Sequence, residues 1–254
     1  MIDSHTHIFA NNTIDPEIVI NNIKEENLDK VLAICCDIDQ RTDLAVELAK
    51  NDTTFDLAIG IHPSDIKYYT NEVLDKVYNY CKLKQVVAVG EIGLDYHWDK
   101  DNKDIQKQWF IEQINIANKL NKPVIIHTRD AIEDTYDILK NYPVNKKGVM
   151  HCFSSSYEMA LKFIELGFYI SFGGPVTFKN ARVAKEVAEK IDINYLLCET
   201  DAPYLTPEPF RGTTNQAINV KYVYKQISEL RNIKLDELKE VVSKNYNRLF
   251  HNEN

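Results

Sequence analysis

The chain has 254 residues, of which 44% are hydrophobic and 27% are charged. This composition supplies enough apolar surface for a core and excludes disordered, collagen-like and coiled-coil chains. The formal net charge of −8 argues against broad, non-specific attraction to a polyanion. It does not exclude a nuclease, because metal ions can supply the positive charge that meets a phosphate.

No apolar run approaches the length of a membrane span, and the first residues lack the basic, apolar and small-residue order of a signal peptide. We therefore expect a cytoplasmic protein that does not enter a membrane. The five cysteines have neither CxxC nor metal-knuckle spacing, so we expect reduced thiols. Nothing in the sequence indicates an obligate protein partner.

Short β-branched runs alternate with longer segments of helical periodicity, which is the pattern of βα units around a parallel sheet. Eight such units predict an α/β fold, a single (β/α)₈ TIM barrel that forms one domain over residues 1–254. The predicted strands are residues 1–7, 31–36, 56–62, 86–92, 123–127, 148–152, 168–172 and 195–201.

Three segments carry signals for the start of a helix. Asp15-Pro16 places a capping carboxylate before a proline at the first helical position. The pairs Asp130/Glu133 and Ser155/Glu158 have the spacing of capping boxes.

The segment 104–120 has apolar residues at helical spacing, which predicts a helix with one face on the sheet. Two more helices, over residues 219–230 and 235–249, are predicted to end the chain. The predicted apolar face of the first comprises Ile105, Trp109, Ile114, Ala117 and Leu120.

Two histidines end the first predicted strand. Side chains in a strand alternate between faces, so His5 and His7 share one face and are suitable ligands for one metal ion. For this tripeptide alone, a chance pairing near the N-terminus is the alternative interpretation.

Polar side chains capable of metal binding stand at the ends of six predicted strands, and five of the chain's seven histidines are among them. In an α/β barrel these strand ends meet at one mouth, where barrel enzymes carry out their chemistry. The residues are His5, His7, His62, Glu91, His127, His151, Glu199 and Asp201.

Imidazole and carboxylate without thiolate suit Zn²⁺, Mn²⁺, iron or, with more oxygen ligands, Mg²⁺. Four histidines with Glu91 and Asp201 exceed the three protein ligands usual for one catalytic zinc, and the two oxygens of Glu91 can bridge a pair of ions. The sequence therefore predicts two divalent ions. For any one of these residues alone, a hydrogen-bonded pocket residue is an equal alternative.

Six segments taken in order resemble the motifs of the TatD family of metal-dependent deoxyribonucleases, within the amidohydrolase-like barrel superfamily. The resemblance runs from the first residues to the last helix and is closest to cytoplasmic bacterial members with Tyr-His-Trp-Asp-Lys, here Tyr96 to Lys100. The segments are Ile2 to His7, Gly60 to Pro63, Gly90 to Tyr96, Ile126 to Arg129, His151 to Phe153 and Glu199 to Leu205.

The resemblance implies roles for particular residues. His5, His7 and Asp201 would hold one ion, His127 and His151 the second, and Glu91 would bridge them. Activity would use Mg²⁺ or Mn²⁺, with Zn²⁺ also possible. The implied reaction is attack of a metal-activated water on a DNA phosphodiester, with Asp201 taking the proton of the water. The expected substrate is a single-stranded or frayed 3′ end, trimmed as by a 3′–5′ exonuclease of DNA repair.

Substrate contacts are predicted at the same mouth. His62 would donate a hydrogen bond to the scissile phosphate, or alternatively satisfy a neighbouring carboxylate. Arg129, Lys179 and Arg211 follow three of the strands and could meet flanking phosphates, or be solvated surface charges. Glu199 would orient a metal ligand or line the pocket, or be a buried neutral carboxylate.

Tyr96 and Tyr204 could stack on bases of a frayed end, or pack on their neighbours. The segment Arg211 to Ala217 lacks the lysine and the proline of the Arg-Gly-Lys-x-Asn-x-Pro sequence common in relatives, which bears on the substrate and not on the metal ligands. The alternative enzyme is a hydrolase of a small ester, lactone, amide or phosphotriester on the same metal layout. A binding protein with structural metals would be expected to lack Glu91 or Asp201.

Overall fold

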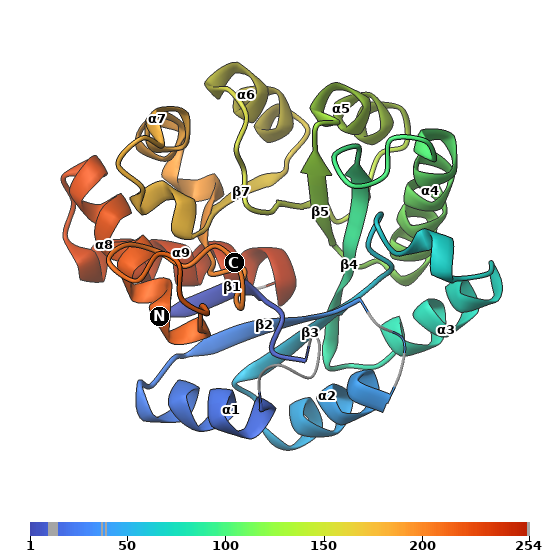
Figure 1. Ribbon diagram of the computed structural model, residues 1–254, viewed down its shortest axis with the longest axis horizontal. Coiled ribbons are helices and arrows are strands. Elements are labelled where there is room, and N and C mark those ends of the chain that lie inside the picture. Colours follow the sequence, from blue (N-terminus) through green and yellow to red (C-terminus); the bar gives the residue numbers. More distant parts are fainter. Residues whose placement is uncertain (10–14, 37, 39, 253–254) are drawn as a thin grey trace.

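Eight parallel strands form one sheet in the order β1 to β8, in a computed structural model that describes residues 1–9, 15–36, 38 and 40–252. Figure 1 shows the helices as a ring outside the strands, with the chain winding once around from blue to red. The predicted (β/α)₈ barrel is confirmed. No helix within the described ranges is both long and apolar enough to cross a membrane.

The strands lie where the β-branched runs predict them, but several boundaries differ. The first, third, sixth and eighth strands end earlier than predicted. The segments just after them therefore contain His7, His62, His151, Glu199 and Asp201. The strands are β1 (Ile2–Thr6), β2 (Lys30–Cys35), β3 (Phe55–Ile59), β4 (Val86–Asp95), β5 (Val124–Arg129), β6 (Gly148–Met150), β7 (Tyr169–Phe172) and β8 (Leu196–Cys198).

A helix follows each strand, and the two predicted C-terminal helices are confirmed as α8 and α9. The helices are α1 (Pro16–Glu25), α2 (Gln40–Asn51), α3 (Glu72–Cys81), α4 (Lys103–Leu120), α5 (Ile132–Asn141), α6 (Tyr157–Glu165), α7 (Arg182–Lys190), α8 (Val220–Arg231) and α9 (Leu235–Phe250). Short 3₁₀ turns are η1 (Ile66–Tyr68), η2 (Gly174–Thr177), η3 (Ile193–Tyr195) and η4 (Ala217–Asn219).

One of the three predicted helix caps is correct as written. The Asp15 carboxylate accepts a hydrogen bond from the backbone of Glu17, with proline at the first position of α1. At α6 the cap is Ser156 and not Ser155, because Ser156 has the extended backbone that turns its hydroxyl toward the helix. The cap predicted at Asp130 is wrong, since its φ of +54° lies in the left-handed region and α5 begins two residues later without a side-chain cap.

The inner face of α4 differs from the predicted one at its start. Ile105 is 47% exposed, and the neighbouring Gln106 is buried in its place. The amide of Gln106 accepts from the backbone N–H of Asp95 and donates to its carbonyl, while the buried Gln113 does the same for Ile61. Two glutamines seven residues apart on one helix face thus brace the carboxyl ends of β4 and β3.

The barrel closes at its mouth, where β1 meets the segment after β8. The N–H of His7 donates to the carbonyl of Ala202 at 2.7 Å, and the N–H of Asp201 donates to the carbonyl of His5 at 2.9 Å. An isolated parallel bridge joins Thr6 to Ala202. This closure brings the first and last predicted metal ligands together.

The buried Asp3 stabilises the same contact between β1 and the segment after β8, which we call the seam. Its fully buried carboxyl group accepts hydrogen bonds from the Thr200 hydroxyl at 2.6 Å and the Thr200 N–H at 2.9 Å. Burial raises the pKa of Asp3 well above its usual value. The seam next to the metal ligands is therefore held by side chains as well as by backbone.

The opposite end of the barrel is covered by α9, which packs against β1 and β8. Asn245 donates to the carbonyl of Leu196, the first residue of β8, and the Tyr246 hydroxyl donates to Asp56 at the start of β3. The amino-terminal end is therefore closed by side chains, and access to the interior is from the mouth.

Gly93 is required where β4 and β5 approach each other. It pairs with His127, its φ is +143°, and a Cβ atom there would lie 2.0 Å from the His127 carbonyl oxygen.

We expect Gly93→Ala to lower the free energy of unfolding by more than about 3 kcal/mol, measured by urea denaturation. Gly212→Ala is the control, since its φ of +92° is also positive but nothing lies within 4 Å. It should cost about 1 kcal/mol, and equal losses at the two sites would contradict the packing argument.

Candidate metal centre

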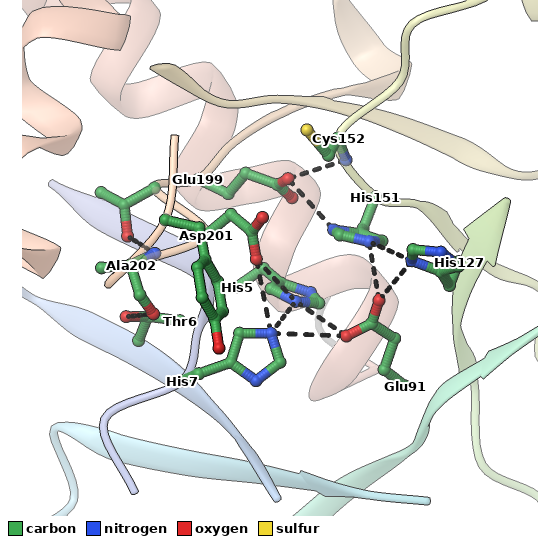
Figure 2. Close-up of polar contacts among 12 residues, drawn as sticks. His5, Thr6, His7, Glu91, His127, His151, Cys152, Glu199, Asp201 and Ala202 are labelled. Atoms are coloured by element: carbon green, nitrogen blue, oxygen red, sulfur yellow. Dashed lines mark hydrogen bonds and ion pairs between the residues drawn. The ribbon is translucent and has the colours of Figure 1, made fainter. Parts of the chain in front are cut away.

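Four side chains from three parts of the chain converge at the seam between β1 and β8 (Figure 2). The Nε2 atoms of His5 and His7 face each other at 3.1 Å. Oδ1 of Asp201 lies 3.6 Å from His5 Nε2 and 3.4 Å from His7 Nε2. Oε2 of Glu91 lies 3.3 Å and 3.4 Å from the same two nitrogens.

These distances fit a cation at the centre of the four donors. Donor atoms around a tetrahedral ion with bonds of about 2.0–2.2 Å are about 3.3–3.6 Å apart. Two imidazole nitrogens and two carboxylate oxygens directed at one point are typical ligands of such an ion. The donor set therefore suits a divalent ion.

The other oxygen of Glu91 faces a second pair of histidines. Oε1 lies 2.7 Å from His127 Nδ1 and 2.8 Å from His151 Nε2, and these two nitrogens are 3.3 Å apart. Each oxygen of one carboxylate thus serves a separate histidine pair. The structure brings together all six predicted ligands, in the arrangement that a bridging carboxylate requires.

Asp95 orients one of these histidines, a role that the sequence reasoning missed. Its Oδ2 lies 3.0 Å from His127 Nε2, which directs the other ring nitrogen, Nδ1, toward Glu91. Its Oδ1 accepts the backbone N–H groups of His97 and Trp98, both at 2.9 Å. The signal was present in the sequence, because a carboxylate four residues after Glu91 in a strand lies on the same face.

Glu199 lies on the far side of the histidines from Glu91. It is fully buried, and its Oε1 accepts the N–H of Cys152 at 2.7 Å and lies 3.3 Å from His151 Nδ1. The rings of His5 and His151 stack with centroids 4.0 Å apart. Both buried Nδ1 atoms and Oε2 of Glu199 are without a hydrogen-bond partner among the described residues. Glu199 therefore lies directly behind His151, on the side of the ring away from Glu91.

The electrostatics of the centre favour bound positive charge. Burial opposes ionisation of Glu91, but the nearby His151 and His62 hold the pKa of its carboxyl group well below the usual value. Burial likewise opposes protonation of His7, yet hydrogen bonds to Asp201 and Glu91 raise its pKa to about 9. In the absence of metal, protons on the imidazoles offset the buried carboxylates.

His62 lies in the turn after β3 with its ring edge against that of His127, 4.4 Å between centroids. Its Nδ1 lies 2.7 Å from the Ser64 hydroxyl and 3.2 Å from the Ser64 backbone nitrogen, and its Nε2 lies 3.6 Å from Glu91 Oε1. Burial and the neighbouring His127 lower the pKa of His62 to about 3. The ring is therefore neutral, with Nε2 directed at the centre.

The three predicted substrate-binding cations lie outside the cluster of ligands. Arg129, at the end of β5, is exposed with its guanidinium 5.5 Å from the centre of the Trp98 ring. The exposed Arg211, in the loop after β8, lies 4.2 Å from the Phe178 ring centre, next to the exposed Lys179. These residues stand around the mouth, and their contact with substrate stays a prediction.

The two tyrosines proposed for base stacking differ in exposure. Tyr96 is only 6% exposed, and its hydroxyl donates to Asp134 at 2.6 Å, so of the two predicted alternatives this ring packs on its neighbours. The ring is held inward because the hydroxyl reaches a carboxylate on α5. Tyr204 is 50% exposed, with its ring 6.0 Å from that of His7.

An eight-stranded barrel with imidazoles and carboxylates gathered at its mouth is the architecture of metal-dependent barrel hydrolases. The sequence profile of the family described as "TatD related DNase" matches residues 2–251. The chain therefore belongs to the TatD family of metal-dependent hydrolases.

Its relatives include the "uncharacterized metal-dependent hydrolase YabD" of Bacillus subtilis, 44% identical over 98% of both chains. The similarly named YcfH of Escherichia coli is 38% identical over 99% of this chain and 96% of its own. The crystal structure of the TatD homologue YjjV from E. coli matches with a TM-score of 0.92 and 29% identity, over 99% of this chain and 98% of the other. An organophosphorus hydrolase from Deinococcus radiodurans, at 11% identity and a TM-score of 0.69 over 98% of this chain and 92% of its own, shares the fold alone.

Asp95→Asn tests how His127 is oriented. The amide can still accept the two backbone N–H groups, but toward His127 it presents a donor where the carboxylate presented an acceptor. The proton of His127 then moves to Nδ1, the nitrogen that faces Glu91. We expect one of two metal sites to weaken by about 10–100-fold, measured by calorimetry. Asp130→Asn, at an exposed acid near the mouth, is the control; equal affinities in both variants would contradict the role of Asp95.

Metal binding is also expected to depend on pH. Because the pKa of His7 is raised to about 9 in the metal-free centre, a metal ion must displace at least one proton at neutral pH. The apparent affinity should rise by at least about tenfold per pH unit below pH 9. Calorimetry in buffers with different ionisation enthalpies measures the released protons directly. An affinity that does not change from pH 6 to pH 8, with no proton released on binding, would contradict this assignment.

Proposed function

We propose that this hydrolase cleaves phosphodiester bonds of DNA at single-stranded or frayed 3′ ends, and that two divalent ions serve the reaction. The observation that carries the proposal is the position of Glu91, whose two oxygens face two separate histidine pairs. A pair of ions suits phosphoryl transfer, because the attacking and leaving oxygens both develop charge.

Ions held by the six ligands would activate a water molecule and offset charge on the phosphoryl oxygens. Asp201 is suited to take the proton of that water. Burial opposes its ionisation, but hydrogen bonding to His7 lowers its pKa, so that the carboxylate is ionised and can accept a proton. His62, neutral and directed at the centre, would donate its Nε2–H to a phosphate oxygen.

The shape and charge of the protein support a strand end as the substrate. The centre lies at a barrel mouth with Glu91 only 2% exposed, which an end can enter more readily than the middle of a duplex. With a net charge of −8, attraction to nucleic acid would depend on local cations such as Arg129 and Arg211. Mg²⁺ or Mn²⁺ is the proposed activating ion, Zn²⁺ being a further candidate, and repair of DNA in the cytoplasm is the proposed setting.

The direct test is hydrolysis of end-labelled single-stranded DNA by metal-stripped protein after addition of Mg²⁺, Mn²⁺ or Zn²⁺. We expect stepwise shortening from the 3′ end that requires metal. Glu91→Gln keeps the shape of the side chain but removes the bridging charge, and should lower the rate more than about 100-fold. Glu237→Gln, at an exposed acid on α9, should cleave as the wild type does.

A protein that binds two ions but leaves every DNA and RNA substrate intact would contradict the nuclease proposal. The same preparation should then be assayed on small esters, lactones, amides and phosphotriesters. Activity on any of these compounds would instead support the alternative function, a hydrolase of small molecules.

A further inference from the structure

The loop after β4 carries an exposed tryptophan at the barrel mouth. Trp98 is 68% exposed, whereas Trp109, on the inner face of α4, is 5% exposed. An indole ring exposed in this way offers a large, flat apolar surface to a ligand. Trp98 belongs to the motif Tyr96 to Lys100, and the metal centre uses none of its side chains directly.

A cation lies against this ring. The Arg129 guanidinium is 5.5 Å from the centre of the Trp98 ring and has no carboxylate partner among the residues that the structure describes. The arginine is therefore placed to attract a phosphate, and the indole ring presents a flat surface beside it.

Trp98 and Arg129 together form a platform on the rim. One carboxylate connects this platform to the metal centre. Asp95 accepts the backbone N–H of Trp98 with one oxygen and contacts His127 with the other. The Gln106 amide donates to the carbonyls of Asp95 and Asp99, on either side of the loop. Hydrogen bonds thus hold the backbone of Trp98 in place relative to the proposed metal ligands.

A groove of about 600 Å³ adjoins the platform between the loops after β4, β5 and β6. Arg129 lines it, as do Thr128 and Cys152, each of which directly follows a proposed ligand histidine. The groove lies on the rim among these loops, and none of the six proposed metal ligands is among the residues that line it.

Asp130, Glu133 and Asp134 are the acidic residues that line the groove, and two of them are paired. Asp134 lies 2.7 Å from Lys107 and also accepts from Tyr96, and Asp130 lies 3.4 Å from His97. Their repulsion of an anionic strand is thereby reduced, while the charge of Arg129 is not paired with a carboxylate.

We propose that Trp98 and Arg129 form a subsite for one unpaired nucleotide of the bound strand, with the base stacked on the indole ring and a phosphate at the guanidinium. This inference rests on the proposed nuclease function. Stacking of this kind accepts every base, because each base has a flat aromatic face.

The test is a set of steady-state measurements on single-stranded octathymidylate and on versions with one abasic site at each of the four positions nearest the 3′ end. Trp98→Ala should raise KM about tenfold, within a range of roughly 5- to 150-fold, and change kcat less than about twofold. Trp98→Phe should keep most of the affinity. Tyr142→Ala, which removes a 46% exposed aromatic ring at the C-terminal end of α5, is the matched control.

One abasic position should reproduce the loss in the wild type and add nothing in Trp98→Ala, because the two changes remove the same contact. Binding of a phosphorothioate-blocked oligomer should also quench tryptophan fluorescence in the wild type but not in Trp98→Phe, where Trp109 remains. Calorimetry should show unchanged metal binding in all three variants.

Additive losses at every abasic position, or an unchanged KM in Trp98→Ala, would overturn the subsite while leaving the nuclease function intact. Absence of nucleic-acid cleavage by the wild type together with absence of fluorescence quenching would instead overturn both. Quenching without cleavage would support the subsite and count against the nuclease proposal alone.

Discussion

The carboxylate of Glu91 is the constraint on which the mouth of this barrel depends. It is 2% exposed and lies between two histidine pairs, so its charge must be balanced inside the protein. Without metal the balance comes from protonated imidazoles, and with metal it would come from cations at the same places. The raised pKa of His7 and the lowered pKa of Glu91 are two aspects of that one requirement.

The fold meets this requirement by bringing distant segments into register at one end. The seam between β1 and β8 places His5 and His7 beside Asp201 through backbone hydrogen bonds. The glutamines of α4 hold the ends of β3 and β4. Asp95 then connects the centre to the rim, because one carboxylate holds both a proposed ligand ring and the loop of Trp98.

Much of the fold and of the candidate ligand set could be predicted because both depend on regular periods. Alternation along a strand places every second side chain on one face, and parallel strands end at one mouth, so histidines at strand ends must come near one another. The errors fall where the period is lost. Asp130 takes a left-handed backbone, and Ser156 caps the helix in place of Ser155.

The sequence by itself determined the barrel, the six residues gathered at its mouth and the family to which the chain belongs, because strand period and motif order are local properties of the chain. Only the tertiary structure decided which oxygen of Glu91 faces which histidines, that Asp95 and Glu199 stand behind them, and that the exposed ring on the rim is Trp98 and not Tyr96. Those outcomes depend on contacts between elements distant in sequence, where burial and hydrogen bonding choose among conformations that local periodicity leaves equally open.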